Sequence, residues 1–388
     1  MMPSFVVRRL AMKSSFRRSG PESMLLGRCV SPARKAGALG WRRGQSRPGE
    51  RRIMTAEQVV DAAEHDAALH GGVPEPTEIA HGVWTLPMEF PSKGQPLRYT
   101  LSYVLTDAAG GVHLIDPGVD TDSNWKRLEA HLAARGRSSA DIRSVIVTHL
   151  HFDHLGMGAR VRAMTGAEVV LHRLEQAAID GEFGGEDRER FDRWGVPHER
   201  RDELARITAE RFSKAQITAD RLVEGGGRLV LGDIELDVIW TPGHTYGSIC
   251  LRDAERKLLF TGDHVLPVLN PGLGLGGPTP SNPISDYLDA LDRVAGFDDH
   301  QVCPGHGYRF FGLRARCDKL GAHHARRTAE VAEVLDRLDR PSVWQVASEL
   351  YWSLGWENLS HYLLDSALAQ VEMHIDRLGR TAETERAA

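Results

Sequence analysis

The sequence has 388 residues, 41% of them hydrophobic, and a formal net charge of −5 at pH 7. This composition suffices for one large core and a smaller unit, and no apolar run approaches the ~20 residues that a membrane-spanning helix needs. The four cysteines, Cys29, Cys250, Cys303 and Cys317, are widely spaced and form no CxxC pair. The sequence therefore predicts a cytoplasmic protein in a reducing compartment, with no membrane partner and no disulfide scaffold.

The N-terminal stretch differs from the rest of the chain in charge. Residues 1–53 carry thirteen Lys or Arg against two acids, whereas the remainder has a net charge of −16. The stretch is rich in Arg, Ser and Gly and has neither a periodic apolar pattern nor the apolar block of a secretory signal. We interpret it as a disordered or spurious extension, with Met54 as an alternative start. A targeting or nucleic-acid-binding arm is the competing interpretation.

The elements that follow alternate between helices and strands. Residues 55–70 have helical spacing, and 125–136 form an amphipathic helix that ends on Gly136. Apolar stretches bounded by Gly and Pro turns predict strands. These are 82–88, 99–107, 112–118, 144–149, 167–172, 228–240, 248–253, 257–262 and 300–305.

Three further segments complete the expected organisation. Residues 174–222 are charged and helix-favouring, and we interpret them as an inserted helical lid. A Pro- and Gly-rich loop covers 267–283 and precedes a helix near 284–295, and the pattern is helical from about 312. The order strands, helix, strands occurs twice along the chain. It predicts an α/β fold, with an αββα sandwich over 54–311 and a helical domain over 312–388. The lid and the loop are expected to form the substrate pocket.

The segment VTHLHFDHLG, residues 147–156, concentrates side chains that bind metals. His149 and His151 are two residues apart, so on an extended or turning segment their rings point the same way. Asp153 and His154 follow, where a helix should begin. Borderline metals such as zinc accept imidazole and carboxylate together, and this spacing suits two adjacent ions better than one.

Partners for this segment are expected from a pattern that recurs downstream. An apolar strand leads into a glycine turn and then a ligand-type residue in WTPGH, which ends at His244, in FTGD, which ends at Asp263, and in VCPGH, which ends at His306. Strand ends bring such residues to the rim of a sandwich, where functional sites gather. LIDPG repeats the texture and offers Asp116 as a carboxylate to orient a ligand.

These motifs resemble those of a known superfamily. HLHFDH is similar to the HxHxDH signature of the metallo-β-lactamase fold hydrolases, and TPGH, TGD and PGHG resemble its later motifs in the same order, over about residues 80–311. The resemblance implies two zinc ions per chain, with iron or manganese as alternatives. One metal would lie on His149, His151 and His244, the other on Asp153, His154 and His306, with Asp263 as a bridge.

Asp263 also indicates which branch of the superfamily the chain resembles. The commonest zinc β-lactamases have a cysteine at this position, whereas an aspartate is similar to glyoxalase II-like thioesterases, acyl-homoserine lactonases and an RNA-cleaving branch. The resemblance implies a hydroxide shared by the two metals, oriented by the catalytic carboxylates Asp153 and Asp263. Its expected target is a small ester, thioester or lactone. Tyr246 and Tyr308 are considered as leaving-group acids, although packing is the favoured interpretation of both.

The C-terminal helices leave an alternative open, because they resemble the winged-helix-like tail of the RNA-cleaving branch. A metal-dependent ribonuclease acting on single-stranded RNA is therefore the second hypothesis. The acidic body and the lack of an aromatic-plus-basic stripe favour a small-molecule partner over nucleic acid. The tail is expected to pack on the catalytic domain or to form a homodimer. A ligand-sensing regulator without turnover is a third, weaker hypothesis, because the ligand set is complete.

Four other histidines are given no ligand role. His264 is expected to pack or to orient a ligand, and His172 to end a strand. His323 and His324 lie in a helical pattern and are interpreted as surface residues.

Overall fold

The computed structural model describes residues 56–91, 97–183, 189–212 and 217–380. The basic stretch over 1–53, including Cys29, lies outside these ranges, so the interpretation of it remains a prediction. No helix in the described ranges is both long and apolar enough to cross a membrane.

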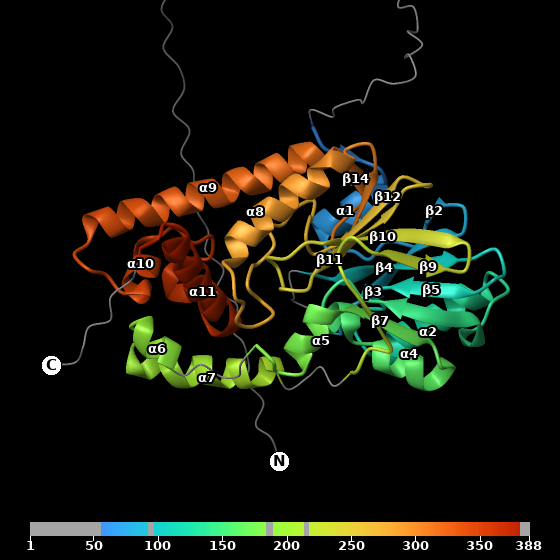
Figure 1. Ribbon diagram of the computed structural model, residues 1–388, viewed down its shortest axis with the longest axis horizontal. Helices are drawn as coiled ribbons and strands as arrows, with labels where there is room; N and C mark the ends of the chain where they lie inside the picture. The colour runs from blue at the N-terminus through green and yellow to red at the C-terminus, as the bar shows by residue number, and fades with distance from the viewer. Residues whose placement is uncertain (1–55, 92–96, 184–188, 213–216, 381–388) are drawn as a thin grey trace, which may run out of the picture. The chain divides into compact units, whose positions relative to one another are not determined.

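Two seven-stranded sheets form the body of the protein (Figure 1). The first has the order β2-β3-β4-β5-β6-β7-β8, antiparallel from β2 to β5 and parallel from β5 to β8. Its strands are β2 (Glu78–Ala80), β3 (Val83–Glu89), β4 (Tyr99–Thr106), β5 (Val112–Ile115), β6 (Ile142–Ile146), β7 (Glu168–His172) and β8 (Arg221–Val223).

The second sheet has the order β1-β14-β13-β12-β11-β10-β9 and is antiparallel except between β12 and β13. Its strands are β9 (Arg228–Leu231), β10 (Ile234–Trp240), β11 (Ile249–Asp253), β12 (Leu258–Gly262), β13 (Gln301–Pro304), β14 (Phe310–Phe311) and β1 (Gln58–Val59). The facing sides of the two sheets share one core, in which Leu101 and Ile146 of the first sheet pack with Leu251 and Phe260 of the second.

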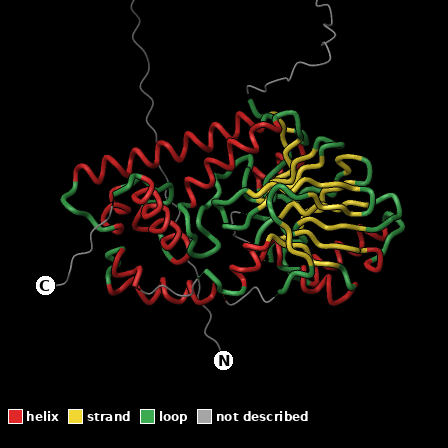
Figure 2. The backbone as a smooth tube through the Cα atoms, viewed as in Figure 1, coloured by secondary structure: helices red, strands yellow, loops and turns green. Residues whose placement is uncertain are grey.

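Helices cover the outer face of each sheet, as Figure 2 shows. The outer face of the first packs on α2 (Asp122–Ala133) and α4 (Gly158–Thr165), through Trp125, Leu128 and Val161. The outer face of the second packs on α8 (Pro283–Val294) and α9 (Leu313–Arg337). The predicted αββα sandwich is therefore confirmed.

The C-terminal region is helical, as predicted, with α9 followed by α10 (Val343–Glu349) and α11 (His361–Arg377) and no strand between 312 and 380. Within 174–222, the described residues contain most of α5 (Arg173–Ile179), then α6 (Glu189–Arg193) and α7 (His198–Phe212). Phe191, Trp194 and Leu204 share a buried core with Val331 and Leu368 of the C-terminal helices. Side chains of the inserted segment therefore pack on the C-terminal helices (Figure 1).

Two local predictions were wrong. Residues 58–59 form strand β1, and α1 (Ala62–His70) begins only after Asp61, because β1 pairs with β14 and the Asp61 carboxylate accepts hydrogen bonds from the first free N–H groups of the helix. His324 was predicted at the surface but is only 2% exposed. It packs between Tyr287 of α8 and His374 of α11, because helices lie over both sides of α9 at this position.

Candidate metal centre

Three imidazoles converge at one point on the rim of the sandwich. Nδ1 of His151 lies 3.0 Å from Nε2 of His149 and 3.1 Å from Nε2 of His244. Asp263 Oδ2 lies 3.5 Å from the same Nε2 of His244. One ligand atom from each of the four residues lies within 4.8 Å of the others, as a single metal ion requires.

A second group of ligand atoms lies beside the first. His154 Nε2 and His306 Nε2 are 3.3 Å apart, and Asp153 Oδ2 is 3.2 Å from the nitrogen of His306. Oδ1 of Asp263 lies 3.4 Å from the Nε2 atoms of both His154 and His306. Asp263 thus directs one oxygen to each group, which is the arrangement of a bridging carboxylate. The structure brings together all seven residues that the motifs indicated.

Strand ends place these side chains. His149 and His151 follow β6, and Asp153 and His154 lie on the short α3 (Phe152–Leu155), which begins after His151. The loops after β10, β12 and β13 carry the other three, His244, Asp263 and His306. A Cβ at Gly305 would lie 2.6 Å from His154 Cε1 and 2.8 Å from Asp263 Oδ1, so only glycine allows this backbone to approach the centre.

Asp116 orients the second group. Its Oδ2 accepts a hydrogen bond from Nδ1 of His154 at 2.8 Å, which directs Nε2 of that ring towards the second group. Thr148 donates its backbone N–H and its hydroxyl to the same carboxylate, each at 2.8 Å. The same hydroxyl lies 3.0 Å from Nδ1 of His149. Because its own proton is donated to Asp116, it accepts a hydrogen bond from the N–H of that ring. Asp116 has a φ of +53°, a costly conformation for a residue other than glycine.

Backbone carbonyls fix the other three rings. Nε2 of His151 donates to Leu275 O at 3.2 Å, Nδ1 of His244 to Gly272 O at 2.6 Å, and Nδ1 of His306 to Tyr99 O at 2.9 Å. Burial lowers the pKa of His151 and His244, so in these neutral rings the donating nitrogen uses the only proton and the converging nitrogen carries a lone pair. Gly272 and Leu275 belong to the 267–283 loop, which therefore positions the centre.

The electrostatics of the two groups differ. Burial, together with neighbouring histidines, lowers the pKa of His149 well below its usual value and that of His151 to about 3, so these rings are neutral at pH 7. Burial alone would also lower the pKa of His306, but Asp263 and Asp153 together raise it to about 10. The second group therefore lies in a negative field that favours positive charge.

The donor set fits metal ions. Three lone pairs about 3 Å apart in the first group repel one another unless a cation lies between them. Oδ1 of Asp263 is buried and has no hydrogen-bond partner. Imidazoles with carboxylates suit zinc, and also iron or manganese.

The sequence motifs do not include Glu175. This buried residue of α5 accepts hydrogen bonds from the N–H groups of Leu150 and Gly247, both at 2.6 Å. Leu150 lies between two predicted ligands and Gly247 lies three residues after another, so one carboxylate joins the loops that carry them. Burial raises the pKa of Glu175 to about 7. Nothing near Glu175 in the sequence marks it, since its partners are distant in the chain.

The remaining predicted residues lie outside the two groups. Tyr308 is buried against the ring of His65, with ring centroids 4.7 Å apart, and Tyr246 packs on Trp240. His264 is buried edge-on against Tyr287. His172 ends β7 and caps α5 through Leu174 N. These contacts are those of packing and capping residues.

Known proteins similar to this chain belong to one superfamily. The model of the metallo-beta-lactamase superfamily matches residues 96–306, a range that contains all seven residues of the two groups. The chain is also similar to a crystal structure of a metallo-beta-lactamase family protein from Thermus thermophilus. That structure is 28% identical, has a TM-score of 0.60, and is matched over 78% of this chain and 94% of its own.

Two curated relatives are thioester hydrolases by name. Acyl-coenzyme A thioesterase MBLAC2 of Gallus gallus is 33% identical over 171 residues, which are 43% of this chain and 57% of that protein. Hydroxyacylglutathione hydrolase of Polaromonas sp. (strain JS666 / ATCC BAA-500) is 30% identical over 190 residues, 48% of this chain and 56% of that protein. The chain thus spans little more than half the length of these two relatives.

Proposed function

Because the chain belongs to the metallo-beta-lactamase superfamily, we propose that it is a dinuclear metal-dependent hydrolase that cleaves thioesters. The observation that carries the proposal is the position of Asp263, whose two oxygens face two separate groups of buried ligand atoms. In this proposal the first metal binds His149, His151 and His244, and the second binds Asp153, His154 and His306. Zinc is the proposed metal.

The proposed chemistry divides between the metals and the chain. Two metal ions, when bound, lower the pKa of water enough to supply a hydroxide nucleophile near neutral pH. The carboxylates of Asp153 and Asp263 accept hydrogen bonds and orient the attacking water. Asp116 and the carbonyl of Tyr99 hold the protons of His154 and His306 on Nδ1, which keeps their Nε2 atoms free. Water adds to the thioester carbonyl, the C–S bond breaks, and a carboxylic acid and a thiol are released.

Thioesters are proposed as substrates because the two curated relatives described above share this linkage, although one carries coenzyme A and the other glutathione. Esters and lactones undergo the same attack and remain second choices.

The ribonuclease hypothesis receives no support from the C-terminal region. Basic side chains that would contact RNA form contacts within the chain: Arg316 is buried and donates to Leu266 O and Leu269 O, Lys319 pairs with Glu57, and Arg327 pairs with Glu330. Of these three, Arg316 is buried and is therefore not available to a phosphate.

A substrate screen tests the proposal. Purified protein with zinc is assayed against acyl-coenzyme A, hydroxyacyl-glutathione, a homoserine lactone and single-stranded RNA, each before and after chelation. We expect thioester hydrolysis that is lost on chelation and restored by zinc. Cleavage of RNA without cleavage of any thioester would overturn the proposal in favour of the ribonuclease.

A further inference from the structure

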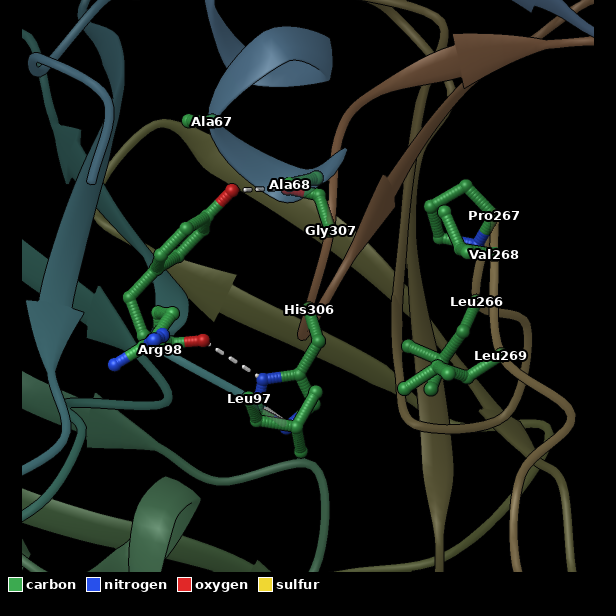
Figure 3. Close-up of a pocket in the computed structure, with 11 residues that line it drawn as sticks. Ala67, Ala68, Leu97, Arg98, Leu266, Pro267, Val268, Leu269, His306 and Gly307 are labelled. Carbon is green, nitrogen blue, oxygen red and sulfur yellow. Dashed lines mark hydrogen bonds between the residues drawn. The ribbon is translucent and has the colours of Figure 1, made fainter. Parts of the chain in front are cut away.

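A pocket in the structure shares His306 with the second group of ligand atoms (Figure 3). Its cavity volume is about 80 Å³. His306 and Gly307 line it, together with Leu97, Arg98 and Tyr99 on one side, the segment from Leu266 to Leu269 on another, and Ala67 and Ala68 of α1. His306 therefore belongs both to the pocket and to the second group of ligand atoms.

Buried polar contacts hold the pocket walls in place. Glu64 of α1 accepts a hydrogen bond from Nε of Arg309 at 2.8 Å, and both side chains are buried. This pair anchors the helix close to the His306 loop. Tyr99 donates its hydroxyl to Gly307 O at 2.8 Å (Figure 3), and Arg316 donates to the carbonyls of Leu266 and Leu269, each at 2.6 Å. The pocket is therefore a formed feature of the fold.

The lining is predominantly apolar. Alanine, leucine, valine and proline side chains supply most of it, and Arg98, Tyr99 and His306 are its charged or titratable members. Val268 and Leu269 of this lining are 48% and 42% exposed. An apolar group in the pocket would cover them, so the chemistry of the walls favours a hydrocarbon ligand.

We propose that this pocket binds the acyl chain of the thioester substrate, with the carbonyl held at the metal centre beside His306. The inference rests on the proposed function. The acyl side is chosen because the thiol side of coenzyme A carries several phosphates and glutathione carries two carboxylates, whereas Arg98 is the one Lys or Arg among the described residues that line the pocket. The substrate class is accordingly an apolar acyl thioester and not a small polar hydroxyacyl thioester.

The test uses chain length as the variable. The holoprotein is assayed with acetyl-, butyryl-, hexanoyl- and octanoyl-coenzyme A and with a hydroxyacyl-glutathione. Each methylene that enters the pocket should raise kcat/KM by roughly fourfold, equivalent to about 0.8 kcal/mol, until the pocket is full. Ala68→Trp fills the pocket from α1 and should lower kcat/KM for hexanoyl-coenzyme A by at least about tenfold, while the acetyl thioester changes less than about twofold, since losing roughly two buried methylenes suffices.

Two further variants control the interpretation. Ala63→Trp makes the same replacement on the exposed side of α1 and should change neither substrate. Leu269→Ser makes one wall polar without removing the carbonyl that Arg316 contacts, and should reduce the preference for long chains even if Ala68→Trp fails to fold. Equal losses on acetyl and hexanoyl thioesters, or no change in either pocket variant, would overturn the inference.

A binding measurement separates this inference from the proposed function. Octanoate binding to the zinc-loaded protein is measured by calorimetry for wild type, Ala68→Trp and Ala63→Trp. Binding that weakens at least about fourfold only in Ala68→Trp supports the pocket even if no thioester is hydrolysed, because the loss of about one buried methylene accounts for such a change. If octanoate binds in this way and no thioester is hydrolysed, the proposed function is wrong but the pocket assignment stands. Equal binding by all three proteins, together with no chain-length preference, would refute the pocket assignment even if thioesters are cleaved.

Discussion

Replacing Glu175 by Gln tests how the metal centre is held together. The two carboxylate oxygens accept hydrogen bonds from Leu150 N and Gly247 N, and the side chain is fully buried. A glutamine has one acceptor oxygen, so its NH₂ group must face one of these N–H groups. Even when protonated, the carboxyl keeps a lone pair on each oxygen, whereas the NH₂ of glutamine has none, so we expect the unpaired N–H to cost about 1–3 kcal/mol of unfolding free energy at low pH.

The cost should depend on pH in a defined direction. Burial raises the pKa of Glu175 from 4.5 to about 7 in the folded protein. Between these values the folded state holds a proton that the unfolded state releases, so the contribution of Glu175 to stability is greatest below pH 4.5 and falls as pH rises towards 7. The fall amounts to about 3 kcal/mol. Glutamine does not titrate, so the deficit of Glu175→Gln should shrink between pH 5 and pH 8.

Denaturant unfolding at pH 5 and pH 8, with the same excess of zinc, measures this deficit. Glu182→Gln, a change at an exposed position near the end of α5, is the matched control and should show neither the deficit nor its pH dependence. We also expect Glu175→Gln to lower metal affinity or kcat by roughly 10- to 100-fold, as changes to groups behind metal ligands do. A deficit that is constant or grows with pH would refute the reasoning.

Two other predictions concern the bridge and the N-terminus. Asp263→Asn should keep the fold but lower kcat at least ~10²-fold, a loss of about 2.7 kcal/mol, because a neutral amide cannot offset two metal dications; turnover like that of wild type would disprove the bridging role. A chain that begins at Met54 should keep the melting temperature and thioester turnover of the full chain, because the net charge and the periodicity of apolar residues change abruptly there. A large drop in melting temperature would show that residues 1–53 stabilise the body.

The sequence predicted those features that short motifs encode. Each of the seven proposed ligands lies within eight residues of the end of a strand that is rich in apolar residues. Fold and ligand positions could therefore be predicted together from local patterns. Asp116 could be found in the same way because LIDPG repeats the strand-and-turn texture.

Features that depend on contacts between distant segments could not be predicted. Glu175 contacts Leu150 and Gly247, which are 25 and 72 residues away in the chain. His324 is buried because α8 and α11 pack around α9, which the pattern of α9 alone does not indicate. The pocket joins Ala68 to His306 across most of the chain. The 174–222 segment was expected to form the substrate pocket, yet none of its described residues lines this one.

The most direct test of the account is the metal content of the purified protein together with its thioester turnover. Elemental analysis of wild type and of His149→Ala, followed by an acyl-coenzyme A assay on the same samples, gives both quantities. We predict close to two transition-metal ions per wild-type chain, a clear loss of metal in the variant, and turnover that follows metal content. A wild-type protein that contains no metal and still hydrolyses the thioester after chelation would contradict the central claim.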